Sequence, residues 1–93
     1  MLEDQDWIEN LKTVREYLAK EFSGFVMTED SSDPGILHKF TMTNPETNEQ
    51  FKLKVGWLRL SEKSNNPEKT ERSLVHGGVA HKMRQRKGQY FYW

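Results

Sequence analysis

The sequence predicts an α+β fold in which an N-terminal helix packs on an antiparallel sheet. Three observations support this prediction. Apolar residues recur at helical spacing near the start of the chain, apolar and polar residues then alternate, and clusters of turn-forming residues separate the alternating segments. A chain of 93 residues can bury one hydrophobic core but not two, so we expect residues 1–93 to form a single small domain.

The first predicted element is a helix within residues 4–24. Asp4 or Asp6 can cap its start, where a carboxylate also meets the positive end of the helix dipole. Gly24 can adopt the left-handed conformation that ends many helices. We expect one apolar stripe of this helix to face the core, and its members are Trp7, Ile8, Leu11, Val14, Leu18 and Phe22.

Three alternating segments follow and predict an antiparallel meander of three strands. The expected strands lie within residues 24–29, 36–43 and 50–60, and the turn-forming clusters between them span 31–35 and 44–49. In the third segment, Phe51, Leu53 and Val55 alternate with Lys52 and Lys54, so that one face is apolar and the other is basic.

The third segment changes phase at Gly56. Apolar residues occupy odd positions up to Val55, whereas Leu58 and Leu60 occupy even positions. A β-bulge at Gly56-Trp57 would add one residue to the strand and return both leucines to the core face. We therefore predict such a bulge.

Residues 61–73 carry no apolar side chain and predict either a mobile loop or a weakly held short helix. Asn66 and Pro67 suit the N-cap and the first turn of such a helix. Leu74 and Val75 are the apolar residues that could anchor it. The pattern leaves both alternatives open.

The remaining residues favour a C-terminal β-hairpin. Val79, His81 and Met83 alternate with basic residues, and Lys87-Gly88 can turn the chain into the aromatic segment "QYFYW". A helix is the alternative over residues 79–87, because Val79 and Met83 are also four residues apart. The hairpin accounts for more residues, since it gives one apolar face and one face with cations at even spacing.

This basic and aromatic segment provides the candidate partner-binding residues. Cations can meet an anionic surface, and exposed aromatic residues commonly anchor interfaces. In a strand, Tyr90 and Tyr92 share one face while Phe91 and Trp93 share the other, so we expect one pair in the core and the other exposed or in an interface. The candidates are Lys82, Arg84, Arg86, Lys87, Tyr90, Tyr92 and Trp93.

The charges are separated along the chain although the net charge is zero. Residues 1–50 hold four Lys and Arg against eleven Asp and Glu, a net charge of −7, while residues 51–93 hold ten against three, a net charge of +7. Either the two halves neutralise one another in the fold, or the molecule keeps an acidic and a basic pole. Opposed poles would favour self-association, because the basic end of one copy could meet the acidic helix of another.

No catalytic, metal or cofactor site is indicated. The chain has no cysteine, and His76 and His81 are five residues apart, so they share no helix face and lack the spacing of a zinc site. Gly77-Gly78 is not accompanied by a nucleophile motif, and no glycine-rich phosphate loop is present. We expect a protein that is not an enzyme and has no catalytic residues, metal ligands or small-molecule cofactor.

These observations predict a non-catalytic binding or regulatory module. Its partner would be another protein or a second copy of itself, engaged through the basic, aromatic hairpin. RNA or DNA binding through the same residues is the alternative, since cations suit phosphates and aromatic rings suit stacked bases. No apolar run approaches the ~20 residues that span a bilayer, and the acidic N-terminus is unlike a signal peptide. With no cysteine, we expect a cytoplasmic protein that does not associate with membranes.

Overall fold

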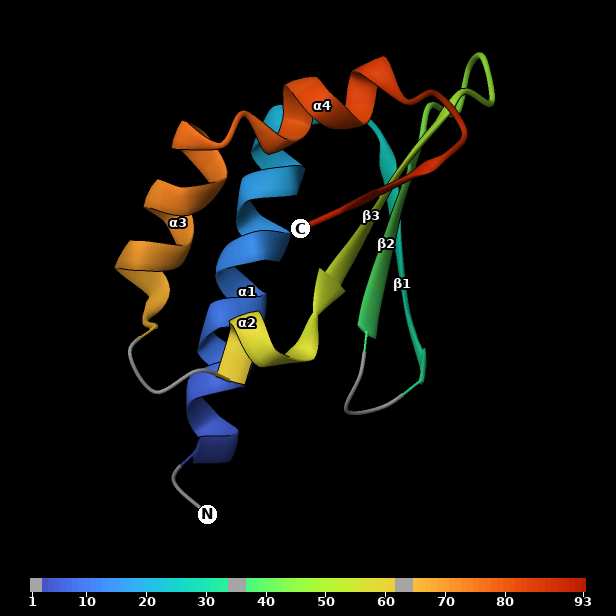
Figure 1. The fold of residues 1–93 in the computed structure, drawn as a ribbon. Helices are drawn as coiled ribbons and strands as arrows, with labels where there is room; N and C mark the ends of the chain where they lie inside the picture. Colours follow the sequence, from blue (N-terminus) through green and yellow to red (C-terminus); the bar gives the residue numbers. More distant parts are fainter. Residues whose placement is uncertain (1–2, 34–36, 62–64) are drawn as a thin grey trace.

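The computed structural model describes residues 3–33, 37–61 and 65–93 and has the predicted α+β class. The helices lie on one side of a four-stranded sheet, with α1 between α3 and the sheet, and α4 across the end of α1 (Figure 1). In chain order the elements are α1 (Glu3–Glu21), β1 (Val26–Asp33), β2 (Leu37–Thr43), β3 (Gln50–Gly56), α2 (Trp57–Ser61), α3 (Pro67–His76), α4 (Val79–Gln85) and β4 (Tyr90–Tyr92).

Helix α1 packs on the sheet as predicted, and its apolar stripe joins the core. Leu11, Val14, Leu18 and Phe22 are buried together with the inward-facing residues of β2 and β3. Ile8 is instead 51% exposed, because it lies at the margin of the stripe. The helix already includes Glu3, so Asp4 and Asp6 lie within its first turn and are not its N-cap. Gly24, with a φ of 87°, allows the turn into β1.

The three-stranded antiparallel meander is confirmed over β1, β2 and β3, which pair in the order β1-β2-β3. The predicted bulge at Gly56-Trp57 is wrong. Strand β3 ends at Gly56, and Trp57 begins the short helix α2. A helical turn changes the period of the side chains, so Leu60 reaches the core while Leu58 is 81% exposed.

For residues 61–73 the predicted alternatives were a loop and a short helix, and the structure has the helix, α3, which extends to His76. Residues 62–64 of this segment lie outside the described residues. The predicted cap is confirmed, since the Asn66 side chain accepts a hydrogen bond from the Lys69 N–H at 2.8 Å and Pro67 occupies the first turn. Leu74 anchors the helix in the core, whereas Val75 is exposed.

The predicted C-terminal β-hairpin is wrong, and the helical alternative for residues 79–87 holds over Val79–Gln85. Val79, Ala80 and Met83 are buried on one face of α4, while His81 is exposed. A strand would have turned His81 to the same side as Val79 and Met83, so helical spacing buries more apolar surface and leaves the imidazole in water.

The sheet is therefore mixed and not wholly antiparallel. Strand β4 pairs with β3 in parallel, and it forms one edge of the order β1-β2-β3-β4. In the described part of the segment between β3 and β4, the chain forms α2, α3 and α4, and this crossover returns it to the end of the sheet where β3 begins. The Gly88 N–H, in a turn with a φ of 75°, donates to the Gln50 carbonyl oxygen at 3.0 Å and sets the start of β4.

Candidate partner-binding surface

Strand β4 places its aromatic side chains alternately on the two faces of the sheet. Tyr90 pairs with Lys52 and Tyr92 pairs with Lys54, so both tyrosines share the face that points away from the helices. Phe91 and Trp93 pack against the hydrophobic core on the opposite face. The two pairs face opposite sides of the sheet as expected, but the expected division into an exposed and a core pair holds only in part. Tyr92 is 62% exposed, whereas Tyr90 is half-buried, and Phe91 and Trp93 are only partly buried against the core.

On the outer face, lysines from β3 cover the tyrosine rings. The Lys54 Nζ lies 4.6 Å from the centroid of the Tyr90 ring and 4.8 Å from that of Tyr92. It also donates a hydrogen bond to the Tyr92 Oη at 3.0 Å. The Lys52 Nζ lies 5.2 Å from the Tyr90 centroid. Both lysines are therefore held beside β4 by cation–π attraction.

On the opposite face, cations from two helices meet the other two rings. Lys82 and Arg86, at the end of α4, lie 5.7 and 5.8 Å from the centroid of the Phe91 ring. Arg59 of α2 lies 4.5 Å from the centroid of the Trp93 ring. We call the set formed by these aromatics and cations the β4 surface; it comprises Lys52, Lys54, Arg59, Lys82, Arg86, Tyr90, Phe91, Tyr92 and Trp93.

The structure brings together five of the seven predicted site residues and engages the other two elsewhere. Lys82, Arg86, Tyr90, Tyr92 and Trp93 belong to the β4 surface. Arg84 stacks 4.6 Å from the Phe22 ring and donates to the Glu21 carbonyl oxygen at 2.6 Å, which ties α4 to the C-terminal end of α1. Lys87 pairs with Glu49 at 3.1 Å.

Three cations of the β4 surface were not among the predicted site residues, namely Lys52, Lys54 and Arg59. For Lys52 and Lys54 the signal in the sequence was the basic face of the third alternating segment, but nothing local indicated that β4 would pair beside it. Parallel pairing of β3 with β4 aligns Lys52 with Tyr90 and Lys54 with Tyr92. The site thus depends on a contact between segments that lie far apart along the chain.

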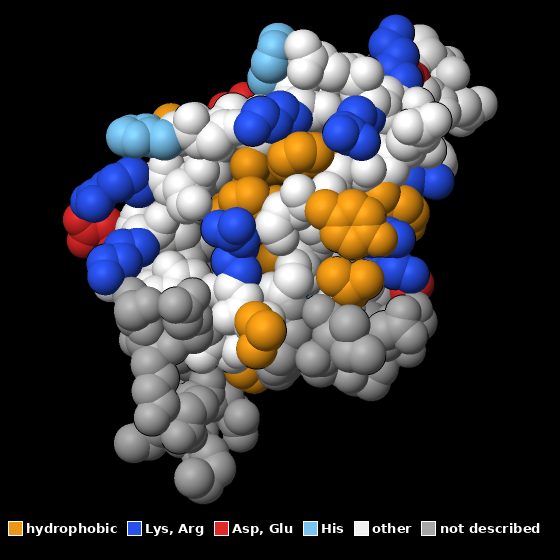
Figure 2. Space-filling model, in the orientation of Figure 1, with side chains coloured by type: hydrophobic (Ala, Val, Ile, Leu, Met, Phe, Trp, Pro, Cys, Tyr) orange, Lys and Arg blue, Asp and Glu red, His pale blue; other side chains and the backbone are white. Residues whose placement is uncertain are grey.

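The cations of the β4 surface have no carboxylate partner among the described residues. Ion pairs among the described residues instead join Arg15 and His38 to Glu29, Arg72 to Glu68 and Lys87 to Glu49. Figure 2 shows hydrophobic side chains gathered where β4 passes below α4, with Lys and Arg side chains around them and the visible acidic side chains at the margins. Positively charged side chains therefore gather around β4.

The clearest cluster of titratable groups lies at the other edge of the sheet. Glu29 of β1 accepts a hydrogen bond from the Arg15 Nη2 at 2.8 Å, and its Oε1 lies 2.9 Å from the His38 Nε2. The hydrogen bond from Arg15 lowers the pKa of Glu29 below its ordinary value, against the opposing effect of partial burial, and His38 adds to the lowering. The cluster ties α1 to β1 and β2.

This cluster predicts an acid-sensitive part of the stability. Because the pKa of Glu29 is lower in the folded state, its stabilisation is present above the ordinary carboxyl pKa of about 4.3 and is lost as the pH falls through the folded value. We expect the free energy of unfolding, measured in urea between about pH 5 and 3, to fall more steeply for the wild type than for Glu29→Gln. Glu71→Gln, on α3, is the control; equal slopes for the wild type and Glu29→Gln would contradict the prediction.

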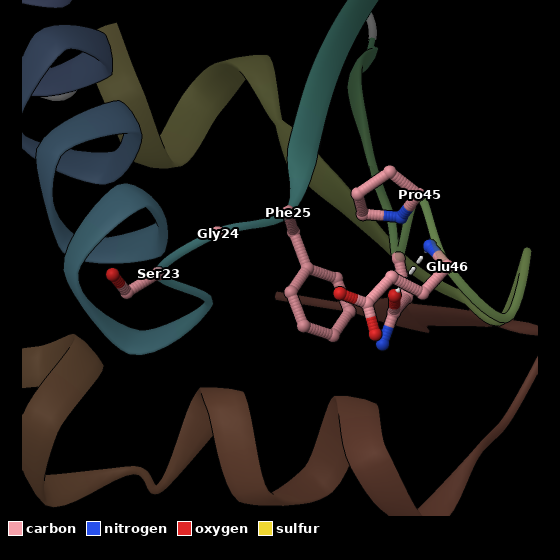
Figure 3. Close-up of a pocket in the computed structure, with 6 residues that line it drawn as sticks. Ser23, Gly24, Phe25, Pro45 and Glu46 are labelled. Carbon is pink, nitrogen blue, oxygen red and sulfur yellow. Dashed lines mark hydrogen bonds between the residues drawn. The ribbon is translucent and has the colours of Figure 1, made fainter.

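Among the described residues, the other histidines lie outside any metal-binding cluster, and one surface hollow is well defined. His76 and His81 are exposed, and the described residues contain no group of three His, Cys, Asp or Glu that could hold a metal ion. An open hollow of about 210 Å³ lies between the end of α1 and the turn after β2. Figure 3 shows the Phe25 ring between Ser23 and Glu46. The backbone N–H of Glu46 donates a hydrogen bond to the Asn44 Oδ1. One exposed carboxylate beside a ring offers no acid–base pair.

Comparison with known proteins does not assign the chain to a family. No protein-family model, curated protein or solved structure matches it significantly. Among the described residues, no helix combines the length and the apolar character needed to cross a membrane. The function is therefore inferred from the geometry and charge of the β4 surface.

Proposed function

We propose that this protein is a non-catalytic binding module that engages an acidic segment of a partner protein through the β4 surface. The observation that carries the proposal is the ring of five cations around four aromatic side chains, with no carboxylate partner for these cations among the described residues. Such a surface attracts an approaching anionic partner, and the exposed Tyr92 side chain offers an aromatic anchor beside the cations.

The arrangement of the tyrosines favours an acidic protein over nucleic acid. A base stacks on the exposed face of an aromatic ring, but Lys54 lies over both Tyr90 and Tyr92. The cations also lie on both faces of the sheet edge, whereas a single strand of nucleic acid follows one continuous basic groove. RNA or DNA binding is the alternative, supported by the presence of lysines and tyrosines together on the outer face.

The partner is a different protein or a second copy of this chain. The acidic first half of the sequence supplies the second possibility, since exposed carboxylates lie on α1. A molar mass that rises with concentration would identify self-association. The lack of cysteine suits the reducing cytoplasm in which we propose that the protein acts.

Direct titration tests the proposal. We expect a fluorescein-labelled ten-residue peptide of alternating Glu and Thr to bind, as measured by anisotropy, and a Gln/Thr peptide of the same length to bind at least about tenfold more weakly. Binding of the acidic peptide should weaken between about 0.05 and 0.5 M salt, because salt screens surface charges over a few ångströms at the higher concentration. Equal binding of the two peptides, no binding of either, or tighter binding of a ten-nucleotide single-stranded RNA would overturn the proposal.

A further inference from the structure

Strand β4 has one edge that pairs with no strand among the described residues. It lies at the end of the order β1-β2-β3-β4, so β3 occupies one of its sides. Edge strands present backbone N–H and C=O groups on which another strand can pair. The directions of the backbone groups of β4 show which residues offer these groups.

The backbone groups of Trp93 and Phe91 point toward β3. The Trp93 N–H donates to the Lys54 carbonyl oxygen at 2.8 Å, and the Gly56 N–H donates to the Trp93 carbonyl oxygen at 3.1 Å. Successive residues of a strand direct their backbone groups to opposite sides. The N–H and C=O groups of Tyr90 and Tyr92 are therefore directed away from β3, toward the outer edge.

Cations lie beside β4 on both faces of the sheet, next to this outer edge. Lys52 and Lys54 are on the face of the tyrosines, while Lys82, Arg86 and Arg59 are on the face of Phe91 and Trp93. Side chains of a strand added at the edge would alternate between these two faces. Acidic side chains on either face of the added strand would thus meet cations.

We infer that the outer edge of β4 accepts an extended, acidic segment of a partner protein as an additional strand of the sheet. This inference rests on the proposed function and adds to it the mode of binding, in which backbone hydrogen bonds to Tyr90 and Tyr92 hold the segment and the surrounding cations select its charge. The same cations repel basic strands and so limit indiscriminate edge-to-edge pairing. With three residues in β4, the pairing is short, and the charge contacts supply much of the selectivity.

Amide hydrogen exchange on the unmodified protein tests the inference directly. On saturation with the Glu/Thr peptide, exchange of the Tyr92 amide proton, followed by NMR, should slow by at least about tenfold, because a backbone acceptor would then cover it. The amide of Val14, within α1 and outside the β4 surface, is the internal reference. Binding of the peptide with unchanged exchange at Tyr92 would overturn the inference.

A pair of variants at one position separates the backbone from the side chain. Tyr92→Ala removes the ring and keeps the N–H, whereas Tyr92→Pro also removes the N–H on the outer edge, where proline is tolerated because that group does not pair with β3. We expect Tyr92→Pro to bind the peptide at least about tenfold more weakly than Tyr92→Ala. Equal affinities would overturn the inference and leave the proposed function standing, while failure of the wild type to bind the peptide would overturn both.

Discussion

Replacing Met83 by alanine is expected to lower the free energy of unfolding by about 2–5 kcal/mol, the range found for buried methionine and leucine truncations. Met83 is fully buried on the inner face of α4, beside Val79 and Ala80. Truncation leaves a cavity where α4 meets the core and removes apolar surface from the fold. Urea denaturation at neutral pH, followed by far-UV circular dichroism, measures the change.

The neighbouring His81→Ala variant is the matched control. His81 is exposed on α4, so its truncation should change the free energy of unfolding by no more than about 0.5 kcal/mol. In a β-hairpin, His81 and Met83 would share one face, and both truncations would be costly or both mild. Similar effects of the two substitutions would contradict the helix.

Reversing two charges of the β4 surface is expected to weaken binding of the acidic peptide by about 10- to 100-fold. In Lys82→Glu/Arg86→Glu, two attractions become repulsions beside Phe91, and each reversal at an exposed site costs roughly 1 kcal/mol or more. The fold should be retained, since both side chains are exposed at the end of α4. Anisotropy titration at about 0.05 M salt measures the loss.

The double variant Lys12→Glu/Lys20→Glu provides the control for net charge. It makes the same change of charge on the exposed side of α1, away from the β4 surface, and should reduce affinity by no more than about threefold. If both double variants weaken binding equally, the peptide responds to the overall charge of the protein and the β4 surface is not the binding site. Circular dichroism of both variants checks that each is folded.

The elements with a strong local pattern were predictable from the sequence. The stripe from Leu11 to Phe22 could bury its apolar residues in only one regular structure, a helix, and the alternation before Gly56 similarly specified strands. Asn66 and Pro67 marked the start of α3 by local chemistry alone. In each case the information lay within a few adjacent residues.

The pattern of apolar residues did not specify the structure where the same residues fit both the helical and the strand period. Val79 and Met83 suit both a strand and a helix, and the choice depended on which neighbours were available to cover them. At Gly56, a bulge and a helical turn both return Leu60 to the core, and the structure has the helical turn. The same ambiguity affected the prediction of the candidate site. Because residues 79–85 form a helix, the Arg84 side chain contacts the end of α1 and is not part of the β4 surface.

By itself the sequence determined the α+β class, the N-terminal helix, the meander and the concentration of cations and aromatics near the end of the chain, because these follow from composition and short-range periodicity. Only the tertiary structure decided that β4 runs parallel to β3, and that Lys54 meets Tyr92, a residue 38 positions away. The reason is physical: the crossover through α2, α3 and α4 sets which segments become neighbours, and the energy of that arrangement resides in contacts that no short stretch of sequence contains.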